Sequence, residues 1–450
     1  MSEKNDLACI ILAAGKGTRM KSDHPKVMHK VGGRPIISWI LSAVETLAPD
    51  KIVTVIGPEM EALADSVRPH ETVIQKNRNG TADAVRQAMP QLEGFKGHVL
   101  ILLGDMPFIQ AHTLEKLIND CAEDETAGLS VLGANLENPD GYGRLITGPD
   151  GYLKRIVEDK DASPEEKRFT LINTGAFCVK ADHLAGWLEQ IDNNNAQQEY
   201  YITDLPAIAD KAGYKTRIMV CSDPTEVMGV NSREQLAELE KVFQSTARRQ
   251  AMRAGVTLQD PDTVYFSFDT KLGQDVEIGP NVVFGPGVEI DDKVMIHSFC
   301  HLEGVTVAKN ASIGPFARLR PGSQLGENTR IGNFVEVKNS TLGAGTKANH
   351  LSYIGDSTLG ERVNFSAGAI TVNYDGFDKH RTTIGKDAMI GCNSNLVAPV
   401  EIGEGAYIAA GSTITEHVPA DALSVARNRP IIRDQWAARK RKSRKKQAKS

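Results

Sequence analysis

An apolar residue recurs every six positions through most of the second half of the chain, and this period limits the possible folds more than any other feature. It starts at Leu272 and still holds at Ile414, with three one-residue shifts of phase and one insertion. Glycine often follows the apolar position, as in "IGPNVV" and "LGENTR". A fixed six-residue repeat is the mark of a parallel β-helix, in which each hexapeptide makes one face and three make a coil.

The repeat predicts eight coils of a left-handed parallel β-helix, because it contains 24 apolar positions. An antiparallel sandwich, the alternative, would not require a fixed period. One large break, residues 371–384, is expected to be a loop that reaches a ligand or a neighbouring subunit. The apolar positions are Leu272, Ile278, Phe284, Ile290, Ile296, Leu302, Val307, Ile313, Leu319, Leu325, Ile331, Val337, Leu342, Ala348, Ile354, Leu359, Phe365, Thr371, Ile384, Ile390, Leu396, Ile402, Ile408 and Ile414.

The first ~230 residues follow a different pattern, in which short β-branched runs alternate with amphipathic segments. Residues 7–12, 51–57, 98–105 and 127–134 are predicted strands, and residues 34–47, 80–92 and 112–124 are predicted helices. This alternation is typical of βαβ units and predicts a Rossmann-like, mostly parallel, doubly wound sheet. Such a sheet binds ligands at the carboxyl ends of its strands.

The chain is therefore predicted to have four parts. An α/β domain covers residues 1–230, and a helical arm covers 231–255, opening with a capping box of Ser232 and Gln235. The β-helix covers residues 256–437. Residues 438–450 form a basic tail that we expect to be disordered and solvated; residues 439–450 carry eight positive charges and no acid.

Composition excludes several classes of protein. No apolar run approaches the roughly 20 residues that span a bilayer, and the first residues lack the basic region of a signal peptide. The six cysteines are scattered without a CxxC pair, which argues against a disulfide framework or a zinc site. The basic tail has no interleaved aromatic residues, so nucleic acid is not expected as a partner. We expect a cytoplasmic protein without stable membrane insertion.

The stretch "LAAGKGTRMKSDHPK", residues 12–26, is a candidate phosphate-binding loop. It lacks the Walker spacing, and it has Met20 where the dinucleotide fingerprint needs a third glycine. Glycines at 15 and 17 let backbone N–H groups approach an anion, while Lys16, Arg19 and Lys26 supply positive charge. In "GDMP", Asp105 follows a strand, where a carboxylate can hold Mg²⁺ or can cap the next helix.

"LAAGKGTRM", followed after four residues by "PK", resembles the signature of the sugar-nucleotidyltransferases. The resemblance implies that the anion is a nucleoside triphosphate attacked at its α-phosphorus, with Arg19 and Lys26 as catalytic residues. It makes Asp105 and Asn231, in "MGVNSR", the metal ligands. "IQKNRNGTADAV" resembles the uridine-reading segment, and "GYGR", "IVEDKDA" and "INTG" resemble sugar-binding segments. The implied lining is Leu12, Ala13, Ala14, Gly15, Lys26, Gln75, Gly80, Thr81, Gly104, Gly143, Glu158, Asn173 and Asn231.

From about Leu7 to about Trp436 the chain resembles the bacterial bifunctional enzymes that combine N-acetylglucosamine-1-phosphate uridyltransferase with glucosamine-1-phosphate N-acetyltransferase activity. The β-helix motifs are "RLRPG", "GNFVEVK", "NHLSYIGD", "NFSAGAITVNYDG" and "VAPV". They imply that His350 is the general base, a role that suits an imidazole. The implied glucosamine-phosphate site is Arg320, Lys338, Tyr353 and Asn364. The implied acetyl-CoA site is Ala367, Asn373, Tyr374, Cys392, Ala410 and Arg427.

Cys392 departs from the family pattern, because family members often have serine at this acyl-CoA contact. A thiol is a weaker hydrogen-bond partner than a hydroxyl, so the contact is expected to be lost or to pass to the backbone. Arg320 and Lys338 are 18 residues apart, which places them on one face of adjacent coils.

The resemblance implies two reactions without covalent enzyme intermediates. Acetyl-CoA acetylates glucosamine 1-phosphate, and UTP with Mg²⁺ then converts the product to UDP-N-acetylglucosamine, a precursor for cell wall and lipopolysaccharide. It also implies a homotrimer with the acetyl site between subunits. Two alternatives stay open: a one-reaction nucleotidyltransferase, for example one that makes ADP-glucose with the β-helix serving assembly, and a non-catalytic nucleotide-sugar sensor.

Overall fold

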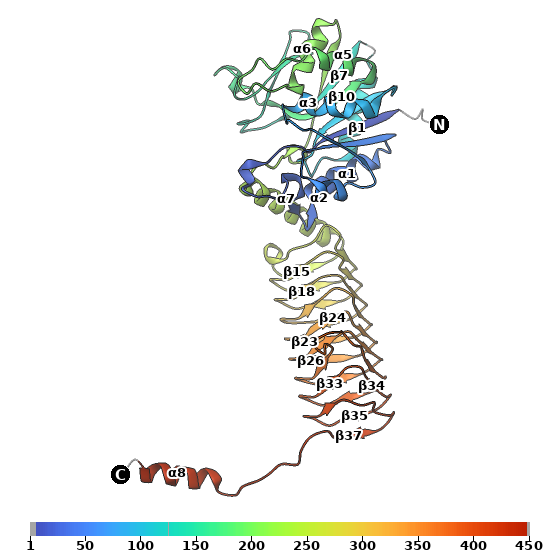
Figure 1. Cartoon of the computed structure of the whole chain (residues 1–450), viewed down its shortest axis with the longest axis vertical. Coiled ribbons are helices and arrows are strands. Elements are labelled where there is room, and N and C mark those ends of the chain that lie inside the picture. Colours follow the sequence, from blue (N-terminus) through green and yellow to red (C-terminus); the bar gives the residue numbers. More distant parts are fainter. Residues whose placement is uncertain (1–5, 125, 448–450) are drawn as a thin grey trace. The chain divides into compact units, whose positions relative to one another are not determined.

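The computed structural model describes residues 6–124 and 126–447, in two compact units that divide between Thr246 and Ala247. Figure 1 labels their elements. The first five residues of the predicted 1–230 domain and the last three of the predicted tail lie outside the described residues.

The first unit is built on a nine-stranded sheet. Its main path is β11 (Lys215–Val220), β7 (Ala127–Asn135), β10 (Leu171–Lys180), β6 (His98–Leu103), β1 (Leu7–Leu12), β4 (Lys51–Ile56) and β5 (Glu71–Ile74). A side branch contains β8 (Arg144–Thr147) and β9 (Leu153–Val157). Neighbours on the main path are parallel, except that β10 runs antiparallel to β6 and β7.

Helices cover both faces of this sheet. Cys9 and Ile11 of β1 point to one core with α1 (Ile36–Thr46), α2 (Glu61–Ser66) and α4 (Ala111–Ala122). Ala8 and Ile10 point to the opposite core with α3 (Thr81–Ala88), α5 (Ala181–Glu189) and α6 (Leu205–Lys211). The doubly wound prediction is confirmed, and each predicted strand and helix begins within two residues of its predicted start. The antiparallel strand β10 was not predicted.

The helix α7 (Arg233–Arg253) lies within the predicted arm. The Ser232 hydroxyl accepts a hydrogen bond from the Gln235 backbone N–H at 3.2 Å, as in a capping box. In a standard capping box the Gln235 side chain would accept a hydrogen bond from the backbone N–H of Ser232. Here the Gln235 Oε1 accepts instead from the backbone N–H of Asn231, one residue earlier, at 2.7 Å. The start of α7 therefore holds Asn231, a predicted metal ligand, in place.

The second unit is a parallel β-helix with three faces. The first face is β12 (Thr257–Leu258), β14 (Glu277–Ile278), β17 (Met295–Ile296), β20 (Ser312–Ile313), β23 (Arg330–Asn333), β26 (Lys347–His350), β29 (Asn364–Phe365), β32 (Met389–Ile390), β35 (Tyr407–Ile408) and β37 (Leu423–Ser424). The second face is β15 (Val283–Phe284), β18 (His301–Leu302), β21 (Arg318–Leu319), β24 (Glu336–Lys338), β27 (Tyr353–Gly355), β30 (Ile370–Val372), β33 (Asn395–Val397) and β36 (Thr413–Ile414). The third face is β13 (Lys271–Leu272), β16 (Glu289–Ile290), β19 (Val305–Val307), β22 (Ser323–Leu325), β25 (Thr341–Leu342), β28 (Ser357–Leu359), β31 (Thr382–Ile384) and β34 (Val400–Ile402).

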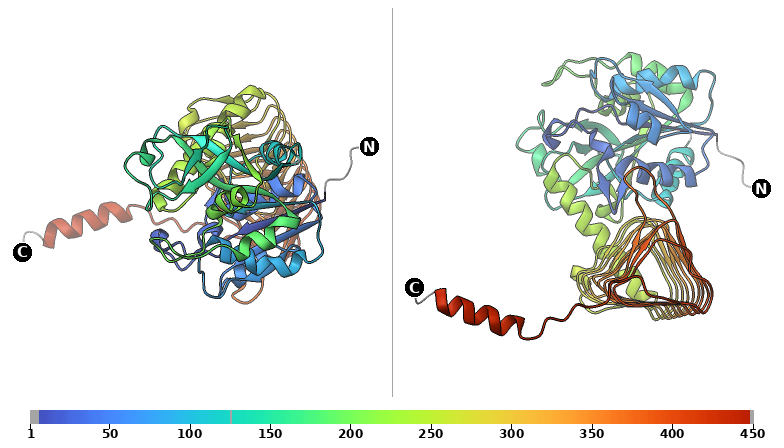
Figure 2. Two further views of the ribbon diagram at one scale, coloured as in Figure 1. Left: turned by 90° about the horizontal axis from the view of Figure 1, so that it is seen from above. Right: turned by 60° about the horizontal axis from the view of Figure 1, so that its bottom comes forward.

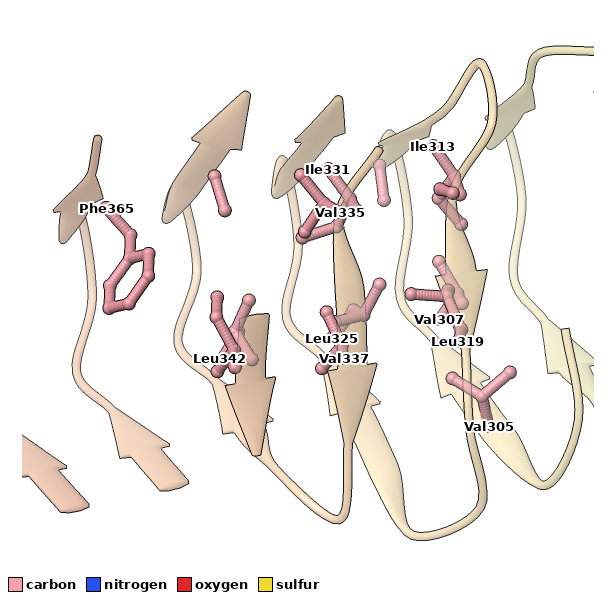
Figure 3. Close-up of a cluster of buried hydrophobic side chains, with 14 of the residues drawn as sticks. Val305, Val307, Ile313, Leu319, Leu325, Ile331, Val335, Val337, Leu342 and Phe365 are labelled. Atoms are coloured by element: carbon pink, nitrogen blue, oxygen red, sulfur yellow. The ribbon is translucent and has the colours of Figure 1, made fainter. Parts of the chain in front are cut away.

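The 24 predicted apolar positions fall one in each of the strands β13 to β36, so the eight coils and the β-helix fold are confirmed. All of them are buried except Leu272, which is half-buried. All of them except the polar Thr371 pack into or against one continuous hydrophobic core along the coils, part of which Figure 3 shows. The right-hand view of Figure 2 shows the coils as a triangle and the inserted loop leaving it.

The end of the chain differs from the expected disordered tail. Residues Trp436–Gln447 form a helix, α8, whose described side chains are exposed. Alanine, arginine, lysine and glutamine all have high helix propensity, and no proline or glycine interrupts this segment. The described part of the tail is therefore helical, in line with the helix propensity of its residues. Within the described ranges, no helix has the length and apolar character needed to cross a bilayer.

Candidate active sites

The first unit contains a cavity of about 840 Å³ at the carboxyl ends of its central strands. Of the predicted nucleotide, sugar and metal residues, all line this cavity except Gly104. Gly104 lies between two lining residues, and a Cβ there would come within 2.9 Å of the Leu12 carbonyl oxygen. Its role is thus the close packing of two strand ends.

The glycine loop that follows β1 makes the tight turn that its glycines predict, with Gly17 in the left-handed region. Gly17 has a φ of +58°, and a Cβ on it would lie 2.8 Å from the Cβ of Lys26. Glycine is therefore required for both conformation and space. Met20 closes the loop by donating its backbone N–H to the Gly17 carbonyl at 2.8 Å and is itself buried. Lys16 and Arg19 line the cavity.

The two predicted metal ligands converge on one cation, the ammonium group of Lys26. Its Nζ lies 2.5 Å from the Asp105 Oδ2 and 3.0 Å from the Asn231 Oδ1. These residues come from segments up to 205 positions apart. A carboxylate oxygen and an amide oxygen are hard donors, and Mg²⁺ is commonly held by one or two carboxylates together with waters and substrate phosphates. Among the described residues, no cluster of three or more histidine, cysteine or acidic side chains forms a metal site.

The predicted uridine-reading segment, residues 74–85, is held in place by the side chains of Gln75 and Arg78. The Gln75 amide group donates to the Gly80 carbonyl at 2.9 Å and to the Asp83 Oδ2 at 2.7 Å. Thr81 accepts from the Ile202 backbone N–H at 2.9 Å, so its hydroxyl oxygen is partly used within the protein. The Arg78 Nε donates to the Ala14 carbonyl at 2.7 Å and joins this segment to the glycine loop.

The predicted sugar side of the cavity is built around Glu158 and a buried arginine. Burial raises the pKa of the Glu158 carboxyl, although a 2.9 Å hydrogen bond from the Thr203 hydroxyl opposes that effect. The Asn173 backbone N–H donates to the Gly143 carbonyl at 2.8 Å. Arg144 is fully buried and lies 3.4 Å from Asp159, so it holds the "GYG" turn from behind.

In the second unit, His350 lies in a groove of about 640 Å³ at the edge between the first and second faces. Its Nδ1 lies 2.8 Å from the Asn333 Oδ1. A carbonyl oxygen can only accept, so the Nδ1 carries the proton and the Nε2 lone pair is free to accept one. The tautomer is thus the one a general base needs.

Three predicted acetyl-CoA positions continue this edge coil by coil. Backbone hydrogen bonds link Gly368 to the Leu351 carbonyl at 3.1 Å, Asn393 to the Ala367 carbonyl at 2.9 Å, and Gly411 to the Cys392 carbonyl at 2.8 Å. Ala367, Cys392 and Ala410 therefore lie in a row that begins at His350, with Arg427 beside its end. Cys392 is exposed. Asn364 lies on the first face, with its amide 2.8 Å from the Met389 sulfur.

The predicted phosphate-binding pair lies at the edge between the second and third faces, whereas His350 lies at the edge between the first and second faces. Arg320 and Lys338 are neighbours in register, since Leu319 pairs with Val337, as the 18-residue spacing predicted. Their side chains have different partners: Arg320 pairs with Glu336 at 2.8 Å, and Lys338 pairs with Asp356 at 3.2 Å. Tyr353 lies on the same face, and its hydroxyl lies 3.5 Å from the Asn373 amide. Tyr374 follows in the loop and bonds the Gly376 carbonyl.

Comparisons with known proteins cover both units. The MobA-like NTP transferase domain matches residues 9–140, and the bacterial transferase hexapeptide (six repeats) matches residues 269–304, 304–339 and 381–416. "Bifunctional protein GlmU" of Paramagnetospirillum magneticum is 48% identical over 433 residues, 96% of each chain. The protein of that name from Zymomonas mobilis is 44% identical over 99% of this chain and 100% of its own. The protein of that name from Geotalea uraniireducens is 41% identical over 97% of this chain and 100% of its own.

The chain belongs to the GlmU family. Membership confirms the resemblance inferred from the motifs, and the GlmU relatives span its whole length rather than one unit. The chain is thus a bifunctional transferase with a nucleotidyltransferase unit and a hexapeptide-repeat acyltransferase unit. A one-reaction nucleotidyltransferase would leave the hexapeptide-repeat unit without a reaction, and a non-catalytic sensor would leave both units without one. Neither alternative agrees with relatives that are named bifunctional.

Sequence reasoning missed several residues of the two candidate sites. Asn333 could have been found from the repeat. Three hexapeptides make a coil of 18 residues, and a one-residue phase shift shortens it to 17. Residue i then lies beside residue i+17 on the next coil, which pairs Asn333 with His350. The same rule pairs Asn339 with Asp356, the last residue of "NHLSYIGD". The buried Arg144 and the linking Arg78 carry no such periodic signal.

Proposed function

We propose that the first unit joins UTP to N-acetylglucosamine 1-phosphate and that the second unit makes this substrate from glucosamine 1-phosphate and acetyl-CoA. The observation that carries the proposal is the presence of two separate, differently built sites in one chain of the GlmU family. The phosphate-binding cavity lies within one unit, and the histidine groove lies within the other.

In the first unit, catalysis is mainly positioning and charge neutralisation. The sugar phosphate attacks the α-phosphorus of UTP, and pyrophosphate leaves. Lys16, Arg19 and Lys26 line the cavity and offset the triphosphate charge. Asp105 and Asn231 would hold Mg²⁺, which when bound neutralises further phosphate charge.

Uridine selectivity is supported by Gln75. Its amide group already donates two hydrogen bonds within the protein, which leaves its carbonyl oxygen as an acceptor toward the cavity. Uracil presents an N–H donor where cytosine presents an acceptor. The same glutamine would therefore accept from uracil and be mismatched with cytosine.

In the second unit, His350 acts as the general base for acetyl transfer. The glucosamine nitrogen forms the amide bond as the thioester C–S bond breaks, and coenzyme A leaves as the thiolate, which then takes up a proton to become the thiol. The His350 Nε2 takes the proton from the nitrogen, and Asn333 keeps the ring in the required tautomer. The row of Ala367, Cys392 and Ala410 would line the acetyl-CoA site.

We also propose that the chain forms a homotrimer in the cytoplasm. Phe299, Phe316 and Phe334 stack in a row beside the His350 groove, with ring centroids 4.9 and 5.2 Å apart. They are 52%, 46% and 55% exposed, and such an apolar row on a surface marks an association site. Light scattering at micromolar concentration tests the trimer, and a monomer would contradict it.

The two activities can be tested in one tube. Glucosamine 1-phosphate and acetyl-CoA are supplied without UTP, and free thiol is followed; UTP and Mg²⁺ are then added, and pyrophosphate is followed. Thiol first and pyrophosphate second supports both sites and their order. Pyrophosphate that appears only when N-acetylglucosamine 1-phosphate is supplied would leave a uridyltransferase alone.

Replacing Lys26 by methionine is expected to strengthen metal binding in the absence of nucleotide, although uridylyl transfer falls. The ammonium group competes for the Asp105 and Asn231 oxygens, so its removal should raise the affinity for Mn²⁺, a paramagnetic substitute for Mg²⁺, by about tenfold. Electron paramagnetic resonance of free Mn²⁺ measures this. Lys16→Met, in the same cavity, is the matched control and should leave the affinity unchanged. Equal Mn²⁺ affinity in the Lys26 variant and the wild type would contradict the competition.

A further inference from the structure

Asp356 is a buried acidic residue of the β-helix, at the edge between the second and third faces. It follows β27 with a φ of +50°, and it is only 5% exposed. An isolated buried carboxylate is costly, so such a group must be compensated by donors. Three side chains surround this one.

The donors come from two different parts of the unit, the end of β24 and the start of the inserted loop. The Lys338 Nζ lies 3.2 Å from the Asp356 Oδ2, and the Asn339 amide lies 2.6 Å from the Oδ1. The Asn373 amide donates to the Oδ2 as well. Burial alone would raise the pKa of Asp356, but the hydrogen bonds from Asn339, Asn373 and Lys338 outweigh it and lower the pKa. The carboxylate is therefore charged and balances the Lys338 ammonium.

Both ends of the inserted loop also meet Asp356. The Asn373 side chain, just after β30, is bound to its carboxylate, and the backbone N–H of Thr382, where β31 begins, donates to its carbonyl oxygen at 3.3 Å. Asn373 in turn lies 3.5 Å from the Tyr353 hydroxyl. One buried residue thus joins Lys338, Tyr353 and the base of the loop.

We infer that Asp356 is a positioning residue of the acetyl-transfer site, which aims the Lys338 ammonium at the sugar phosphate and fixes the loop that begins at Asn373. The inference rests on the proposed acetyl-transfer function. An ammonium group has three donors, and the Asp356 carboxylate engages it from one side. Lys379 of the inserted loop is a further neighbour of the Lys338 ammonium, and the Lys338 side chain stays 18% exposed, so an anion can meet this ammonium from the side away from Asp356. Asp356 itself does not touch the substrate.

The test is Asp356→Asn, which keeps the shape and removes the charge. We expect the KM for glucosamine 1-phosphate to rise about tenfold or more, because a charge-assisted hydrogen bond is lost. The KM for acetyl-CoA and the rate of uridylyl transfer should stay near the wild type. The preference for glucosamine 1-phosphate over glucosamine should fall, which a purely structural role would not cause.

A matched control is available in the same β-helix. Asp387 has a φ of +58° and pairs with Arg362 at 2.7 Å, at a different edge. Asp387→Asn makes the same chemical change on the same kind of backbone, and it should leave both KM values unchanged. Equal effects of the two substitutions would overturn the inference.

A double-mutant cycle makes the test decisive. If Asp356 acts through Lys338, then the double variant Asp356→Asn with Lys338→Met should have nearly the same KM for glucosamine 1-phosphate as Lys338→Met alone. Effects that multiply would overturn the inference. If Asp356→Asn does not fold, Asn339→Gly removes one bond to the carboxylate at a residue with a φ of +46° that suits glycine. It should raise the same KM about threefold, and an unchanged KM would also overturn the inference.

Failure of this inference and failure of the proposed function give different results. A wild-type protein without thiol release would refute acetyl transfer itself. A wild type that acetylates glucosamine 1-phosphate, together with an Asp356→Asn variant of unchanged KM, would refute only the positioning role.

Discussion

Replacing His350 by alanine is expected to reduce acetyl transfer by about 10²–10⁴-fold and to leave uridylyl transfer at the wild-type rate. In the proposed mechanism the Nε2 takes the proton from the attacking nitrogen, because the Nδ1 faces the Asn333 Oδ1 at 2.8 Å. The histidine belongs to a different compact unit from the phosphate-binding cavity, so uridylyl transfer has no reason to change. Thiol release and pyrophosphate release, measured on the same preparation, test both halves.

His297 offers a control for this substitution, since it is another histidine of the β-helix, is half-buried, and has its Nε2 3.4 Å from the Ser312 hydroxyl. His297→Ala is expected to retain both activities. Loss of both activities in a folded His350→Ala protein would contradict the two-site arrangement, and full acetyl transfer would contradict the general-base role of His350.

Replacing Asp105 by alanine is expected to have the opposite effect, with uridylyl transfer reduced at least about a hundredfold and acetyl transfer unchanged. The substitution removes the carboxylate that would hold Mg²⁺, and the metal supplies several kcal/mol of charge stabilisation in phosphoryl chemistry. It also removes the closest partner of Lys26, at 2.5 Å. Pyrophosphate release measures the loss, and Mn²⁺ binding measures its cause.

Asp120 is the matched control, because it is an aspartate of the same unit that pairs with Arg217 at 2.7 Å. Asp120→Ala should lower stability without abolishing pyrophosphate release. If Asp105→Ala retained Mn²⁺ binding and normal turnover, the metal would have to be held elsewhere. If it also stopped thiol release in folded protein, the two sites could not be independent.

The sequence alone was a good guide to features with a local cause. Each hexapeptide of the β-helix buries its own apolar residue, so the period is present before any coil has formed, and all 24 positions fall in strands. The glycine loop is similar, since Gly17 needs a left-handed backbone that can be suspected from the residue type. The residue list of the first cavity followed from motifs, and only Gly104 lies outside its lining.

The tail was misjudged for a local reason as well. Its charge pattern suggested disorder, whereas the helix propensity of its residues decides the conformation of Trp436–Gln447. The antiparallel strand β10 was missed because strand direction depends on which neighbours a segment pairs with, and its apolar residues look the same in either direction.

Only the tertiary structure shows which side chains share a partner. Lys26 meets the oxygens of Asp105 and Asn231 from segments that are 79 and 205 residues away, and the Asp356 carboxylate binds Lys338 and Asn373 from the coils on either side of its own. A repeat or a glycine turn is encoded by the conformational preference and burial of a few consecutive residues. A shared carboxylate depends on strand register and on chain closure over long distances, so it exists only when the whole fold has brought its donors within hydrogen-bond reach.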